Sequence, residues 1–156
     1  MYRLRLHCHV SVAVRFLVVS VQGSLARAVP GRPSDRVVLV VEDDDIIRSV
    51  IVDVLEEHGF QVRRTANGAE ALALLETFRP HAIVLDLLMP VMHGWSFMEE
   101  YAHVTDGQQI PIVVVSVNPI LPRSFDRFGV KRCLGKPFDV EALVSAVEEA
   151  SGLVAA

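Results

Sequence analysis

The stretch AIVLDLLMPVMHG, from Ala82 to Gly94, is the part of the sequence that decides the fold. Its first four residues are apolar, and Asp86 follows them directly. A short apolar run bounded by polar residues is typical of a strand that is buried on both faces of a parallel sheet. Asp86 would then lie at the carboxyl edge of the sheet, where open α/β folds bind ligands. Pro90 and Gly94 predict a loop after this strand. Taken alone, Asp86 would be no more than a solvated strand end, so its neighbours decide its role.

Composition and charge favour a globular protein without a general affinity for nucleic acid. The chain has 156 residues, of which 51% are hydrophobic and 22% charged, enough for one domain with a substantial core. Its net charge of −4 argues against non-specific binding to nucleic acid, which needs a basic surface. The two cysteines, Cys8 and Cys133, make neither a disulfide framework nor a zinc site. We therefore expect a reducing, cytoplasmic setting.

Residues 1–36 differ from the rest of the chain, with six arginines and one short apolar run, Phe16–Val21. Together with the sequence Ala26-Arg27-Ala28, these features imitate a secretory signal peptide. Arg15 interrupts the apolar region, however, which leaves it too short to span a membrane. We expect a loosely ordered extension whose start codon need not be the true one. A membrane-surface or partner-binding segment and a true signal peptide are the alternatives.

Ordered structure is predicted to begin with the apolar run 37–41, which ends in Glu42, Asp43, Asp44 and Asp45. Apolar residues then recur at helical spacing up to Gly59, which is placed to end the helix. Acidic residues at the start of this helix would stabilise its dipole. That explanation suits Asp44 and Asp45, but it leaves Glu42 and Asp43 unexplained.

Strand and helix patterns alternate through the rest of the chain. Strands are predicted at about 60–64, 82–86, 111–115 and 130–134, and helices at about 69–78, 95–101 and 140–151. Asn67-Gly68 indicates a turn. Such alternation implies βαβ units, so we predict a doubly wound, five-stranded parallel sheet with helices on both faces.

Each strong strand ends in a polar side chain: Glu42 and Asp43, Asp86, Ser116 and Lys136. The carboxyl ends of parallel strands share one edge, so these groups would meet there. Clustered carboxylates repel one another, and a site of oxygen ligands suits Mg²⁺, which would remove the repulsion. A carboxylate beside Mg²⁺ can attack phosphorus and form an aspartyl phosphate. Lys136 and Ser116 would then contact the phosphoryl oxygens.

The sequence resembles the receiver domain of two-component response regulators in four stretches with matching order and separation. These are VVLVVEDDD (37–45), IVLDLLMPVMHG (83–94), VVVS (113–116) and LGKPF (134–138). The resemblance covers about 37–151 and implies a flavodoxin-like fold with strand order 2-1-3-4-5. It makes 37–152 the receiver domain and 153–156 a short tail.

The resemblance also implies a role for each residue of the acidic cluster. Asp86 matches the phosphoacceptor of the family. Glu42 and Asp43 match the acidic pair that binds Mg²⁺ together with Asp86. The backbone carbonyl of Leu88 matches the third protein ligand of the metal.

Further positions match the residues that contact the phosphoryl group. Ser116 and Lys136 match the switch hydroxyl and the phosphate-binding lysine, and the bond before Pro137 is cis in the family. The resemblance implies a phosphoryl donor that is a histidine kinase or a phosphotransfer protein. Because no output domain follows Ala156, we expect a stand-alone signalling module that acts through protein contacts and is not an enzyme.

The sequence departs from the family pattern in several places. Glu42 stands where Asp is common, and His93 replaces a frequent acid. Cys133 lies where many members carry the aromatic ring that moves with the switch hydroxyl. The connection between the fourth and fifth strands is about two residues short and contains Pro119 and Pro122, so its helix should be short or distorted.

Two other functions are alternatives to phosphorylation. A pseudo-receiver would use the same fold only to bind proteins, but the site positions here all carry competent residue types. A phosphatase of the haloacid dehalogenase type would need a second Asp two residues after Asp86, where this chain has Leu88. Nucleotide-binding GxxxxGK and GxGxxG motifs are absent from the sequence.

Overall fold

The computed structural model describes residues 36–104, 109–119 and 123–152. The predictions made for residues 1–35 and 153–156 therefore lie outside the described residues. The strands are β1 (Val37–Val41), β2 (Gln61–Thr65), β3 (Ala82–Asp86), β4 (Ile112–Ser116) and β5 (Val130–Gly135). The helices are α1 (Asp45–Glu57), α2 (Gly68–Leu75), α3 (Gly94–Val104), the 3₁₀ helix η2 (Arg123–Phe128) and α4 (Val140–Ala150).

The five strands form one parallel sheet in the order β2-β1-β3-β4-β5, which confirms the predicted flavodoxin-like fold. β3 lies at the centre, where its five residues are all buried. Val41 at the end of β1 pairs with Leu85 of β3, and Asp86 pairs with Val115 of β4. The ends of β1, β3 and β4 are therefore neighbours at one edge of the sheet.

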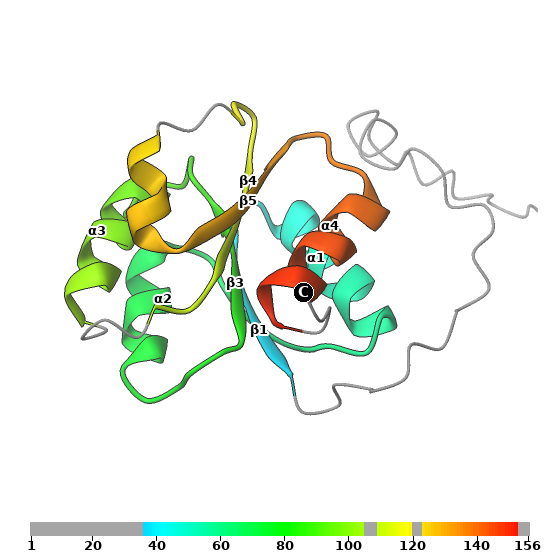
Figure 1. Ribbon diagram of the computed structural model, residues 1–156, viewed down its shortest axis with the longest axis horizontal. Coiled ribbons are helices and arrows are strands. Elements are labelled where there is room, and N and C mark those ends of the chain that lie inside the picture. The colour runs from blue at the N-terminus through cyan, green and yellow to red at the C-terminus, as the bar shows by residue number, and fades with distance from the viewer. Residues whose placement is uncertain (1–35, 105–108, 120–122, 153–156) are drawn as a thin grey trace, which may run out of the picture.

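Helices cover both faces of the sheet, as Figure 1 shows. α1 and α4 pack on one face, and α2, α3 and η2 pack on the other. Successive residues of a strand point to opposite faces, so Val38 and Val40 contact the first helix layer while Leu39 and Val41 contact the second. This alternation gives the domain two hydrophobic cores, and it decides which strand-end side chains can meet.

The acidic run after β1 supplies the helix cap that the sequence suggested. Asp44 is the N-cap of α1, and its side chain accepts hydrogen bonds from the N–H groups of Ile46 and Ile47 at 2.9 and 3.0 Å. Gly59 follows the end of the helix with a φ of 88°, a conformation that favours glycine. Asp44 is therefore structural, which leaves Glu42 and Asp43 for the site.

Two helices differ from their predicted bounds. α2 ends at Leu75 and does not reach residue 78, and Asn67-Gly68 begins this helix instead of forming a separate turn. Asn67 is the N-cap, and a Cβ on Gly68 would lie only 2.9 Å from Met92 Cγ. The glycine therefore serves close packing of α2 against the loop after β3. α3 runs to Val104 instead of residue 101.

In the described part of the connection between β4 and β5, residues 117–119 and 123–129, the helix is the six-residue 3₁₀ helix η2, which confirms that the fourth helix is short. Phe125 anchors η2 in the core, with its ring centroid 4.0 Å from that of Trp95 and 6.2 Å from that of Phe128. Trp95 lies in the first turn of α3, so this contact joins the start of α3 to the segment after β4. Among the residues described, none of the helices combines the length and apolar character needed to cross a membrane.

Candidate functional site

The strand ends bring Glu42, Asp43 and Asp86 together at the carboxyl edge of the sheet. One carboxylate oxygen of each lies within 4.8 Å of the others. Glu42 continues the β1 positions that face α1 and α4, and Asp86 continues the β3 positions that face the same layer. Strand alternation thus places both side chains on one face, where Glu42 and Asp86 are buried.

Lys136 lies between two of these acids. Its Nζ donates to Glu42 Oε2 at 2.7 Å and to Asp86 Oδ2 at 2.8 Å, and its side chain is 9% exposed. The backbone N–H of Lys136 donates to the carbonyl of Ser116 at 2.8 Å, which fixes the residue beside the end of β4. The peptide bond between Lys136 and Pro137 is cis.

The loop after β3 holds the other oxygen of Asp86. The N–H of Leu88 donates to Asp86 Oδ1 at 3.1 Å, so each carboxylate oxygen has a protein donor. That the Leu88 carbonyl is a metal ligand stays a prediction. Gly94 closes the loop: its N–H donates to the Leu87 carbonyl at 3.1 Å, and a Cβ there would lie 2.5 Å from the carbonyl oxygen of Asp86.

Ser116 ends β4 at the same edge but faces the other helix layer. It continues the positions of Ile112 and Val114, which pack toward α2, α3 and η2. Its buried hydroxyl accepts a hydrogen bond from the N–H of Asn118 at 3.3 Å. In this structure the predicted switch hydroxyl is therefore engaged by its own loop.

Burial and close contacts set the protonation of Glu42 and Lys136. Loss of solvent raises the pKa of Glu42 to about 7, and the nearby charge of Asp86 adds to this, while contact with Lys136 lowers the pKa without offsetting burial. Burial alone would lower the pKa of Lys136, but its hydrogen bonds to Asp86 and Glu42 outweigh that effect and raise the pKa. The lysine therefore carries its charge at neutral pH.

The residues of the cluster fit a hard divalent cation. All three acids offer oxygen ligands, which Mg²⁺ prefers, and they lie close enough to share one ion. One ammonium cannot balance three carboxylates, which accords with the raised pKa of Glu42. A cation bound to the acids would remove this imbalance.

Two positions that depart from the family pattern lie away from the acids. Cys133 is partly buried against the core on the α3 and η2 side, and burial raises the pKa of its thiol, so the thiol is neutral at physiological pH. His93 is exposed in the loop after β3.

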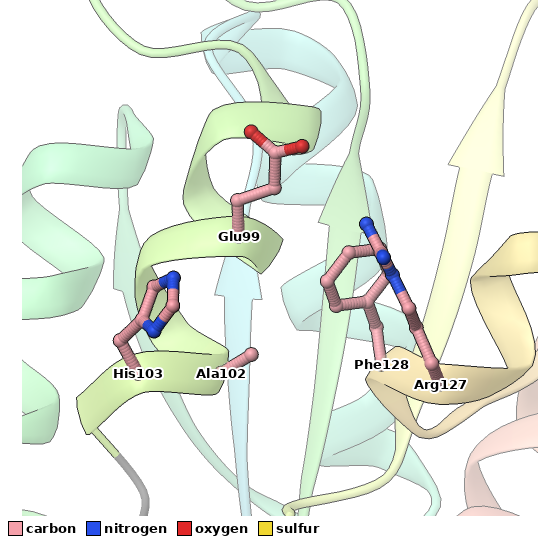
Figure 2. Close-up of a pocket in the computed structure, with 5 residues that line it drawn as sticks. All are labelled: Glu99, Ala102, His103, Arg127 and Phe128. Atoms are coloured by element: carbon pink, nitrogen blue, oxygen red, sulfur yellow. The ribbon is translucent and has the colours of Figure 1, made fainter.

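An open hollow of about 340 Å³ lies between α3 and η2, away from the acidic cluster. Figure 2 shows its lining side chains: Glu99, Ala102, His103, Arg127 and Phe128. Arg127 packs over the ring of Phe128, with Cζ 4.5 Å from the centroid. None of the predicted site residues lines this hollow, so it is separate from the acidic cluster.

Sequence reasoning missed Arg48, in the first turn of α1. Its guanidinium donates to the backbone carbonyls of Glu42 at 2.6 Å and Asp43 at 3.2 Å. The only signal in the sequence was an arginine a few residues after the acids, a pattern that an exposed helix face also produces.

Comparison with known proteins identifies the class to which this fold and site belong. The profile of the response regulator receiver domain matches residues 38–148, more than two thirds of the chain. The chain therefore belongs to the response regulator receiver family, whose members act in two-component signalling and bind Mg²⁺ in an acidic pocket.

Individual relatives differ in how much of their length the chain spans. Protein PilH of Pseudomonas aeruginosa is 26% identical over 112 residues, which cover 70% of this chain and 93% of PilH. The transcriptional regulatory protein PdtaR of Mycobacterium tuberculosis is 31% identical over 122 residues, 78% of this chain and 57% of PdtaR. The probable transcriptional regulator ycf29 of Porphyra purpurea is 28% identical over 112 residues, 70% of this chain and 54% of ycf29. The chain thus spans only about half of two of these relatives.

Solved structures agree with this assignment. The chemotaxis protein CheY4 of Vibrio cholerae has a TM-score of 0.66 and 29% identity, covering 74% of this chain and 98% of CheY4. The receiver domain of the sensor histidine kinase PA1611 from Pseudomonas aeruginosa has a TM-score of 0.67 and 28% identity, covering 75% and 98% of the two chains. That structure has a magnesium ion coordinated in its active site cleft.

Proposed function

We propose that Asp86 accepts a phosphoryl group from the phosphohistidine of a histidine kinase or phosphotransfer protein, in a reaction that depends on Mg²⁺. The observation that carries the proposal is the placement of the Asp86 carboxylate between two further acids within 4.8 Å and the ammonium of Lys136 at 2.8 Å. Such a site combines a nucleophile, metal ligands and a cation for the phosphoryl oxygens. A module that only bound proteins would have no need for this buried charge.

In the proposed reaction, an oxygen of Asp86 forms a bond to phosphorus while the P–N bond of the donor breaks. The electron pair of that bond returns to the imidazole, which takes up a proton, and the product is an acyl phosphate. Mg²⁺ held by Glu42, Asp43 and Asp86 would neutralise charge on the phosphoryl oxygens. Lys136 can contact those oxygens because it already lies on Asp86. The N–H of Leu88 keeps the carboxylate oriented.

The phosphorylated domain would then change its surface for a protein partner. A phosphoryl group on Asp86 places negative charge near Ser116, whose hydroxyl now accepts a hydrogen bond from the Asn118 N–H. The hydroxyl reaches the phosphoryl group only if the loop after β4 moves inward. We propose that the domain meets its donor and its partner in the cytoplasm and contacts no nucleic acid itself. The family relationship supports this role.

The decisive experiment is incubation of the full chain with acetyl phosphate and Mg²⁺, followed by intact mass spectrometry. We expect addition of one phosphoryl group, its loss when Mg²⁺ is chelated, and none in the Asp86→Asn variant, which should keep its fold. Asp53→Asn, on the exposed side of α1, is the matched control and should label normally. An unlabelled wild-type chain would favour the pseudo-receiver, and full labelling of Asp86→Asn would refute the assignment of the acceptor.

A further inference from the structure

Arg48 makes an unusual set of contacts with the loop that carries the acids. It lies in the first turn of α1, yet its guanidinium turns back so that Nη1 donates to the carbonyls of both Glu42 and Asp43. Nη2 contacts Asp45 Oδ1. The Arg48 side chain is only 15% exposed, whereas that of Asp45 is 87% exposed. The buried part of the interaction is therefore the one with the two carbonyls.

These contacts complete the support of the acidic loop. On one side, the N–H of Glu42 donates to the Thr65 carbonyl of β2 at 3.3 Å. On the other side, the cap formed by Asp44 fixes the start of α1. Between them, the peptide groups that follow Glu42 and Asp43 are held by Arg48, because both of their carbonyl oxygens accept from its Nη1. A peptide group is planar, so fixing its carbonyl fixes the backbone from which the neighbouring side chains project.

We propose that Arg48 is a positioning residue for the cation site: it holds the backbone of Glu42 and Asp43 so that both carboxylates face Asp86. The inference rests on the proposed function, because it concerns how that site binds Mg²⁺. Arg48 does not touch the cation or the phosphoryl group in this role. It acts through the two acids.

An arginine suits this role better than a lysine. The guanidinium is a rigid, planar fork with several N–H donors, so it can bond to two carbonyls and to Asp45 at the same time. A lysine keeps the charge but not the planar fork, so it cannot reproduce the whole set of contacts. Arg48→Lys therefore separates charge from geometry.

Charge alone predicts the opposite result from positioning. Arg48 is a cation close to a cation site, so removing its charge should strengthen Mg²⁺ binding if electrostatics were its only effect. If Arg48 positions the acids, removing it should weaken Mg²⁺ binding. The direction of the change in Mg²⁺ affinity therefore distinguishes the two roles.

The test is calorimetric titration of the full chain with Mg²⁺. We expect Arg48→Ala to raise the dissociation constant about tenfold, the size typical for loss of a group that orients metal ligands. Arg48→Lys should fall between Arg48→Ala and wild type. The matched control is Arg132→Ala, which removes an arginine from an exposed ion pair with Glu149 at 2.9 Å and should leave Mg²⁺ affinity unchanged. Asp45→Asn should also change it little, because the contact of Arg48 with Asp45 is exposed.

Labelling by acetyl phosphate provides a second measurement. The Mg²⁺ concentration for half-maximal labelling should rise by the same factor in Arg48→Ala, while the rate at saturating Mg²⁺ stays near that of wild type. Thermal melting in chelator checks that each variant is folded. If Arg48→Ala does not fold, the Mg²⁺ affinity of Arg48→Lys is compared with that of wild type instead. Unchanged or tighter Mg²⁺ binding by folded Arg48 variants would overturn the inference alone. A wild-type chain that neither binds Mg²⁺ nor labels would instead overturn the proposed function, and the inference with it.

Discussion

Two regions at the same edge of the sheet keep the receiver pattern to different degrees. The acidic loops, residues 42–44 and 86–93, carry Glu42, Asp43 and Asp86 and support them with defined bonds, such as those of Arg48 and the Leu88 N–H. The output segment, residues 117–134, has a short 3₁₀ helix and the small Cys133 where many members have a helix and an aromatic ring. The molecule therefore keeps the part that would perform chemistry and varies the part that would transmit it.

This difference has a physical reason. Phosphoryl transfer needs oxygen atoms held at fixed positions, so few substitutions of the acids or of Lys136 are tolerated. Transmission needs only an element with two arrangements that the phosphoryl group can bias, and many packings can provide one. In the output segment the packing comes from Phe125, whose ring lies edge-on against Trp95 at 79°.

The largest effect should come from removing the aromatic anchor of the output segment. Phe125 is 2% exposed, so Phe125→Ala should lower the free energy of unfolding by about 3–5 kcal/mol, through lost burial and the cavity left behind. Phe125→Leu, which leaves a smaller cavity, should lose about 1–2 kcal/mol. Urea unfolding measures both. A loss well below 1 kcal/mol in Phe125→Ala would mean that the output segment is loosely packed. The two regions would then differ in how firmly they are packed and not only in their sequence pattern.

The acidic loops should make the stability of the metal-free protein depend on pH. The pKa of Glu42 is raised in the folded state from its ordinary value of 4.5 to about 7, so between these values the unfolded chain releases a proton that the folded chain keeps. Stability should therefore fall as pH rises from about 4.5 to about 7, by on the order of 2–3 kcal/mol, and level off above.

Melting in chelator over this pH range measures the effect, with Glu42→Gln as the comparison. The variant cannot ionise at this position, so its curve should lack most of the fall. Mg²⁺ binds the ionised acids, so the rise in melting temperature that it produces in wild type should grow over the same range. Identical pH curves for wild type and Glu42→Gln would show that another group governs the metal-free site.

Close packing of the loop after β3 should give a smaller effect. A Cβ at Gly94 would meet the Asp86 carbonyl oxygen at 2.5 Å and Leu87 Cα at 2.9 Å, and both are backbone atoms that cannot yield easily. Gly94→Ala should therefore cost about 1–3 kcal/mol of stability and slow labelling by acetyl phosphate, because the backbone of Asp86 must shift. Gly59→Ala, at a φ of 88° in open space, is the control for backbone strain and should label at the normal rate. Normal labelling of Gly94→Ala would show that this packing does not position Asp86.

Much of the fold could be predicted because it rests on local periodicity. Apolar runs and helical spacing predicted the five strands and the helices between them. The two prolines after β4 predicted that the helix there, η2, is short. The meeting of Glu42, Asp86 and Lys136 also followed, since parallel strands end at one edge. Strand alternation also predicts that these three side chains lie on the same face of the sheet. Each is an even number of residues from a strand position that faces α1 and α4.

The rest depends on contacts that no local pattern encodes. Asn67-Gly68 indicated a turn, but Asn67 caps α2 and Gly68 is its first residue, against which Met92, far along the chain, packs closely. Arg48 offers several donors, and only the folded loop determines that its partners are the carbonyls of Glu42 and Asp43. The packing of Trp95 on Phe125 likewise exists only once α3 and η2 lie together on the sheet.

The smallest effect is expected at Cys133, and it tests whether the signal leaves through the output segment without a switch aromatic. Trp95 is the only tryptophan of the chain, and its ring packs on Phe125 of η2, so its fluorescence should change when phosphorylation moves this segment. Cys133→Ala should keep that change, because a neutral, partly buried thiol is too small to report the position of the loop. Ser116→Ala should abolish it, since no hydroxyl then draws the loop toward Asp86. Intact mass spectrometry must show equal labelling of all three proteins, so that a difference in the fluorescence change cannot come from a difference in phosphorylation. Loss of the fluorescence change in Cys133→Ala at full labelling would make Cys133 part of the switch, and the output segment would then be closer to the family pattern than its sequence suggests.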